Sequence, residues 1–255
     1  MKPFFALYVK ELKAHKILFL FVLLLIAGMN AYGIMQVEYV WHFKDVIESG
    51  DNLPFILWPS FSYFWPMLAV FTLVLSLPFL LAHAFNSEWR SETHYQMFAI
   101  RDSQYIVNLT KVAAVASVGF VGGGMVVCSL YFWMVRKAEF VDGVIELMSF
   151  PHFTLVTGLI LVTYMVFILG LVTGMEGVKF SVKRYRGLTA IAFCLVSVFL
   201  YGWLFLQGER AFEFLGQIAM PPFGVVNVAP CVYTIFTGII FMIIGLVMYE
   251  KRAEI

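Results

Sequence analysis

Charged and aromatic side chains are interleaved between Glu88 and Lys111, in a chain that is otherwise made of long apolar runs. The segment reads EWRSETHYQMFAIRDSQYIVNLTK, and residues 88–104 can form a short helix with one apolar face. We expect this helix to lie at a membrane surface and to bind a soluble partner; a solvated helical connector is the alternative. The residues assigned to this contact are Glu88, Glu92, Thr93, Phe98, Arg101, Asp102 and Ser103.

Groups for catalysis or ion binding are scarce elsewhere, since the cores of the apolar runs hold no Asp, Glu, Lys or Arg. Carriers driven by protons or sodium ions usually place carboxylates there, and a hydrolase needs a nucleophile beside a base. The 5 histidines lack the i, i+4 spacing of a metal site, and the sequence has no GxxxxGK[ST] loop. We expect a chain that is not an enzyme and that binds no metal or cofactor itself.

The composition is that of a polytopic membrane protein. Hydrophobic residues make up 62% of the chain, whereas an average soluble domain has roughly 45–50%. Charged residues make up only 13%, and the net charge of +1 gives no indication of a nucleic-acid partner. Cys128, Cys194 and Cys231 lie inside apolar runs and are interpreted as packing residues.

Six stretches reach the roughly 20 apolar residues that a membrane-spanning helix needs. The sequence therefore predicts an all-α membrane protein with six transmembrane helices in a single transmembrane domain, residues 1–255. The predicted spans are residues 17–37, 61–86, 108–135, 154–175, 188–207 and 230–249.

Basic residues are distributed unevenly between the connecting segments. Thirteen of the 17 Lys and Arg residues fall at the two termini, in the 87–111 region and in the predicted 176–187 loop. The other four lie in segments on the opposite side of the predicted membrane: Lys44, Arg136, Lys137 and Arg210. The positive-inside rule then predicts that both termini are cytoplasmic. We expect a multi-pass protein of a plasma membrane, of bacterial type.

Residues 1–16 predict an amphipathic helix at the membrane interface. Phe5, Tyr8, Val9 and Leu12 follow the i, i+3, i+4, i+7 spacing of one helix face. The anchoring residues, which we expect to face anionic lipid, are Lys10, Lys13 and Lys16. A signal peptide is the competing interpretation, but the run that follows is too long for one.

The segment before the sixth span, residues 209–230, is apolar yet interrupted by prolines. Because proline cannot continue a helix, we expect a half-inserted helix over 210–219 and a proline-rich return, a re-entrant segment that packs on the outer mouth of the bundle. An ordinary outer loop lying flat on the membrane is the alternative. The residues assigned to this segment are Phe212, Phe214, Pro221, Pro222 and Phe223.

Glycines inside the spans predict close helix packing in lipid. They occur as the run Gly122-Gly123-Gly124 and as the pair Gly170 and Gly174.

This order of parts resembles the six-helix membrane subunits of ABC-type exporters, the type-2 export permeases. In that family the segment between spans two and three tends to contain an acid, Gly-Thr, an apolar run, Pro-x-Ser-Arg and a Gly-Lys pair. Glu92-Thr93, Phe98, Ser103 and Lys111 keep this frame, whereas Arg101 replaces the usual proline, Gln104 the arginine and Thr110 the glycine.

The resemblance implies a homo- or heterodimer of permeases, in which the 88–104 helix of each chain docks a separate cytoplasmic ABC ATPase subunit. ATP and Mg would bind to that ATPase, and the bilayer is the other partner. An amphipathic peptide, a lipid-like molecule or a drug is the expected substrate. The alternatives are a channel or facilitator, which needs polar rings along a pore, and a membrane anchor or sensor subunit that transports nothing.

Overall fold

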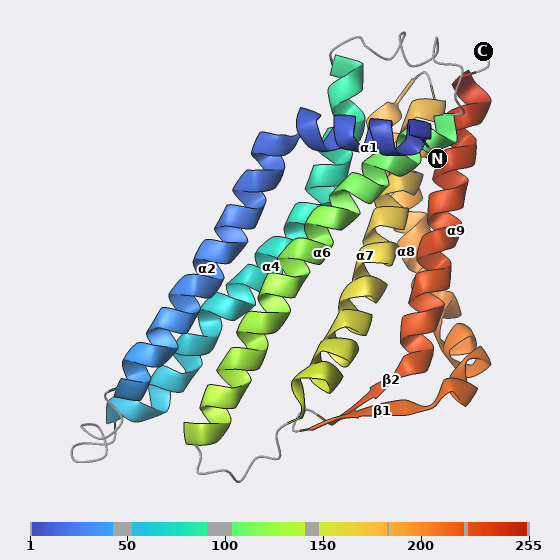
Figure 1. Ribbon diagram of the computed structural model, residues 1–255. Helices are drawn as coiled ribbons and strands as arrows, with labels where there is room; N and C mark the ends of the chain where they lie inside the picture. Colours follow the sequence, from blue (N-terminus) through green and yellow to red (C-terminus); the bar gives the residue numbers. More distant parts are fainter. Residues whose placement is uncertain are drawn as a thin grey trace.

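A computed structural model describes residues 2–42, 53–90, 104–140, 148–182, 184–221 and 224–253. The helices are α1 (Lys2–Ala14), α2 (Lys16–His42), α4 (Leu53–Arg90), α6 (Gln104–Phe140), α7 (Phe150–Ser181), α8 (Arg186–Ala211), the short η1 (Glu213–Leu215) and α9 (Val228–Ala253). Two strands, β1 (Gln217–Met220) and β2 (Gly224–Asn227), form an antiparallel hairpin. Figure 1 shows α1 and the end of α9 at the same end of the bundle, which we call the terminus-bearing end.

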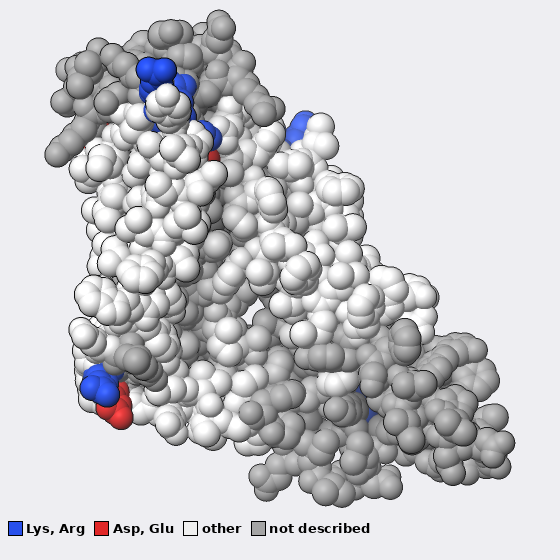
Figure 2. All heavy atoms as spheres, turned by 180° about the vertical axis from the view of Figure 1, so that it is seen from behind, with Lys and Arg blue, Asp and Glu red and all other residues white. Residues whose placement is uncertain are grey.

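Six helices in the described part of the chain are long and apolar enough to cross a membrane. These helices are α2, α4, α6, α7, α8 and α9, and each of them contains one of the predicted spans. On the face in Figure 2, Lys, Arg and Glu side chains gather at the two ends of a largely uncharged body. The chain is therefore a multi-pass helical membrane protein, and the predicted number of spans is confirmed.

One buried cluster joins α2, α4, α6 and α7. Its members include Phe19 on α2, Leu77 and Phe85 on α4, Val115 on α6 and Met165 on α7. All of these side chains are at most 5% exposed. This core supports the terminus-bearing half of the bundle.

Helix α1 lies across the spans at the terminus-bearing end (Figure 1). The Tyr8 hydroxyl is hydrogen-bonded to Ser117 Oγ of α6 at 2.7 Å, and Leu12 packs against the buried cluster that joins α2, α4, α6 and α7. Glu11 is buried on the same side, whereas Phe5 is 66% exposed. The predicted helix is present, but its docked face is centred on Tyr8, Glu11 and Leu12 instead of starting at Phe5.

Helices α7 and α9 approach each other at glycines. A Cβ atom on Gly170 would lie 2.7 Å from the carbonyl carbon of Gly238, and one on Gly177 would lie 2.6 Å from Gly245 Cα. Only glycine permits backbones this close, which is the usual way of packing helices in lipid. The predicted role of Gly170 is therefore confirmed, and α7 and α9 form a tightly packed pair that we call the α7–α9 pair.

The glycine run on α6 behaves less uniformly. A Cβ on Gly122 would lie 3.0 Å from Leu73 of α4, and Gly123 packs against Leu161 of α7. Gly124 has nothing within 4 Å of such a Cβ. Close packing is thus confirmed for the first two glycines, whereas Gly124 makes no such contact among the described residues.

The segment before α9 differs from the expected half-inserted helix. Helix α8 ends at Ala211, η1 covers three residues, and residues 217–220 are strand β1 instead of helix. Gly216, just before β1, and Gly224, the first residue of β2, have φ of 73° and 107°, conformations that glycine adopts without strain. The break before the sixth span is confirmed, but it is built as a β-hairpin.

The hairpin lies at the end opposite the termini and extends from the start of α9 toward α7 (Figure 1). Met220 at the end of β1 packs against a buried cluster of Val127, Met134, Met148 and Phe153. The backbone amide of Val228 donates to Gly216 O at 3.3 Å, which closes the base of the hairpin. The hairpin therefore contacts the ends of α6 and α7, as expected for a segment that packs on this mouth of the bundle.

Candidate functional site: a polar cluster between α4 and α7

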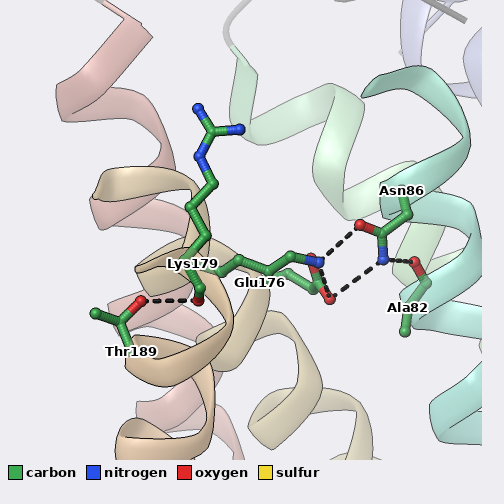
Figure 3. Close-up of polar contacts among 6 residues, drawn as sticks. Ala82, Asn86, Glu176, Lys179 and Thr189 are labelled. Carbon is green, nitrogen blue, oxygen red and sulfur yellow. Dashed lines mark hydrogen bonds and ion pairs between the residues drawn. The ribbon is translucent and has the colours of Figure 1, made fainter. Parts of the chain in front are cut away.

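Asn86, Glu176 and Lys179 form a polar cluster at the terminus-bearing end (Figure 3). Lys179 Nζ donates to Glu176 Oε2 at 2.8 Å and to Asn86 Oδ1 at 2.7 Å. Asn86 Nδ2 donates to Ala82 O at 2.7 Å and to Glu176 Oε1 at 3.4 Å. One amide on α4 thus contacts both charges of an ion pair on α7.

The ion pair is largely removed from solvent, since the side chains of Glu176 and Lys179 are 9% and 22% exposed. Removing charges from water is unfavourable unless their remaining hydrogen-bonding capacity is satisfied. The Asn86 amide does this for both, as its oxygen accepts from the ammonium and its nitrogen donates to the carboxylate. The pair depends on α4 being in place.

The sequence positions Glu176 and Lys179 by their spacing. Residues three apart lie on the same face of a helix, so both side chains project from α7 toward α4. Gly174 and Gly177 beside them are buried against α9, where Gly245 approaches Gly177. The ion pair is therefore carried by the α7–α9 pair, which close packing holds in one arrangement.

Asn86 lies four residues before the end of α4 at Arg90. The next described residue is Gln104, where α6 begins. The cluster thus fixes α4 just before the segment predicted to bind a soluble partner.

A second buried contact fixes the start of α6. Lys111 is 0% exposed, and its Nζ lies 5.2 Å from the centroid of the Phe85 ring on α4. A desolvated cation over an aromatic face contributes about 2 kcal/mol. Phe85 also contacts Tyr249 of α9, with ring centroids 6.4 Å apart. Lys111 and Asn86 therefore anchor the two helices that flank residues 91–103.

Helix α1 and the turn that follows it, which contains His15, add a third polar contact at this end. Glu11 Oε2 and His15 Nε2 are 3.6 Å apart, and both side chains are buried. The His15 ring also meets the edge of the His83 ring on α4, with centroids 5.4 Å apart. Polar residues of α1, α4, α6 and α7 therefore converge at the terminus-bearing end, where they join helices to one another.

The residues predicted from the sequence fall in three groups. Glu88 lies in the last turn of α4, and the other residues assigned to the partner contact, Glu92, Thr93, Phe98, Arg101, Asp102 and Ser103, lie outside the described residues. Lys10, Lys13 and Lys16 are exposed, as an interfacial anchor requires. In the outer segment Phe212 stacks on Phe236 with centroids 5.6 Å apart, Phe214 is 80% exposed and Pro221 follows β1, whereas Pro222 and Phe223 lie outside the described residues.

The cluster was not predicted, because the predicted fourth span ended at residue 175. Helix α7 continues to Ser181, so Glu176 and Lys179 are helical residues packed on α4, and the predicted 176–187 loop is wrong over its first six residues. The available signal was the i, i+3 spacing of opposite charges directly after an apolar run. The burial of Lys111 had no comparable signal, since a lysine at a predicted span end is usually solvated.

Comparisons with protein-family models, with curated proteins and with solved structures give no match for this chain.

Proposed function

We propose that this chain is the transmembrane permease subunit of an ATP-driven exporter of the ABC type, working as a dimer with separate cytoplasmic ATPase subunits. The observation that carries the proposal is the bonding of Asn86 to both Glu176 and Lys179. Asn86 is at the end of the helix that enters the 88–104 segment, and the ion pair is on the α7–α9 pair.

A force applied to the 88–104 segment would act on both flanking helices. On the α4 side it would be transmitted through Asn86 to α7, and on the α6 side through Lys111 to Phe85. Packed helices joined by polar contacts have a few discrete arrangements and do not deform continuously. Binding of ATP to the partner would then bias the bundle between two such arrangements.

The polar residues found in the described spans favour this function over a self-sufficient channel. Several of them are already engaged inside the protein: Ser117 is hydrogen-bonded to Tyr8 of α1, and the hydroxyls of Thr163 and Thr173 donate to the backbone of their own helix. A channel needs polar groups that line a pore in rings. The expected substrate is apolar or amphipathic: a peptide, a lipid-like molecule or a drug.

The experiment is copurification of the full-length, affinity-tagged chain from its own membranes in mild detergent. We expect an ATPase with a GxxxxGK[ST] motif to copurify with the wild type. In the variant Glu92→Lys with Arg101→Glu, binding should weaken by a few kcal/mol if these charges are desolvated at the interface, and by less than about 1 kcal/mol if they lie at a wet rim.

The matched control is Arg210→Glu with Glu213→Lys. It also reverses one charge of each sign, but at exposed positions near the opposite end. All three proteins should reach normal membrane levels. Absence of an ATPase from the wild-type preparation, or equal loss in the control and the 88–104 variant, would reject the proposal in favour of a facilitator or an anchor.

A further inference from the structure

Asn30 of α2 and Ser129 of α6 are buried polar residues deep in the bundle. They are 5% and 3% exposed. Three of their atoms have no hydrogen-bond partner among the described residues: Nδ2 and Oδ1 of Asn30, and Oγ of Ser129. Buried polar groups of native proteins are nearly always satisfied, so these three atoms require an explanation.

The register of the helices brings the two residues to the same level. Ile26, Ala69 and Val126 share one buried cluster, at the junction of α2, α4 and α6. Asn30 follows Ile26 by four residues and Ser129 follows Val126 by three, so each continues the same helix face by one turn. Helices α2 and α6 run side by side in the same direction (Figure 1), so both turns lead toward the same end.

A second contact brackets this level from the other side. Arg136 of α6 and Glu38 of α2 form an ion pair at 2.8 Å. Asn30 is eight residues before Glu38 and Ser129 is seven before Arg136, which corresponds to about 12 Å and about 10 Å along the helices. The two side chains therefore lie at matching depth inside the membrane-spanning region.

We propose that Asn30 and Ser129 form an internal water-binding site at the junction of α2, α4 and α6. The amide offers two donors and an acceptor, and the hydroxyl offers a donor and an acceptor. The two side chains do not hydrogen-bond to each other, so a water between them would satisfy both. A buried water typically makes about three hydrogen bonds.

The chemistry of the site selects water over other ligands. Neither side chain carries a charge, and one amide oxygen with one hydroxyl falls short of the six or more oxygen ligands that a cation such as Ca²⁺ takes. Near-complete burial of both residues excludes a larger polar molecule. Ala69 of α4, which is 0% exposed, has the smallest side chain in the buried cluster at this junction.

The first test is thermal unfolding of the full chain in detergent for Asn30→Leu, Ser129→Ala and the double variant. If one water bridges the pair, each single substitution removes one of the hydrogen-bond partners of that water, so each lowers Tm. The Tm of the double variant is then lowered by less than the sum of the two single decreases, because both residues bind the same water. The control is Thr163→Val, since that buried hydroxyl already donates to Leu159 O of its own helix at 2.8 Å.

If the atoms are instead unsatisfied, replacing them with apolar groups raises Tm, and that result overturns the proposal. Additive losses overturn the shared site as well. The second test needs no variant to fold: solid-state NMR of the wild-type chain in lipid, with asparagine nitrogens labelled. We expect magnetisation transfer from water to the Asn30 side-chain amide, and absence of transfer contradicts the site.

Discussion

Asn86 of α4 accepts a hydrogen bond from Lys179 of α7 at 2.7 Å, while its nitrogen donates to Glu176, the ion-pair partner of that lysine. A single neutral side chain therefore connects the last turns of α4 to the α7–α9 pair. Three groups from two helices satisfy one another, which makes the contact sensitive to the loss of any one of them.

Loss of one charge of the ion pair should be more harmful than loss of both. Lys179→Met leaves the Glu176 carboxylate largely buried without its cation, and such a change typically costs about 3–5 kcal/mol. Glu176→Gln leaves the ammonium group, which is less buried, so we expect a smaller loss. The double variant should recover most of the stability, because no uncompensated charge remains. Chemical unfolding of the four proteins in detergent measures the coupling, and additive losses would show that the pair is not coupled.

Substitution of Gly170 should separate α7 from α9. The added methyl group of Gly170→Ala would overlap the Gly238 backbone, and overpacking of this kind costs about 1–3 kcal/mol. Gly124→Ala is the matched control, since nothing lies within 4 Å of its new Cβ and alanine is the better helix former by about 1 kcal/mol. We expect a lower Tm for the first variant and an unchanged or higher Tm for the control. Equal effects would mean that close packing at Gly170 has no special role.

The fold could be predicted as far as it depends on apolar length. A run such as residues 17–37 has no way to satisfy its backbone in lipid except as a helix, and the same holds for the other five spans. The hairpin could not be predicted in this way. Gln217–Met220 has only four residues, and Pro221 beside it indicated only that a helix must end. The positive φ of Gly224, the first residue of β2, is a local backbone property that the apolar pattern does not reveal.

The polar cluster depends on contacts between helices, which a single sequence does not contain. Glu176 and Lys179 could have been placed on one face by their spacing, but their contact with Asn86 spans about 90 residues of chain. Lys111 was expected at the membrane surface, and its burial follows from the way Phe85 of α4 packs beside it. Hydropathy places residues in or out of the bilayer and does not say which helices are neighbours.

Orientation in the membrane follows from the distribution of basic residues and can be tested with impermeant thiol reagents in intact cells. Cysteines introduced at Lys10 and Arg184, which are exposed, should be protected because the positive-inside rule places them in the cytoplasm. A cysteine at Glu213, which is also exposed, should be labelled. Permeabilised cells provide the control, since all three positions should then react. Labelling of the first two in sealed cells would mean that the true topology is opposite to the predicted one. The 88–104 segment would then lie on the wrong side of the membrane for an ATPase.

The most direct test is whether ATP on a partner changes the arrangement of this bundle. Spin labels at Met35 of α2 and Leu155 of α7, which are 69% and 60% exposed, replace the native side chains in a variant without Cys128, Cys194 and Cys231. Pulsed electron paramagnetic resonance then compares the ATPase complex with and without trapped nucleotide. We predict a shift of the distance distribution on trapping, no shift in the isolated chain, and a reduced shift for Asn86→Leu despite normal ATPase copurification. The same distribution in both nucleotide states of the wild-type complex would contradict an ATP-driven permease.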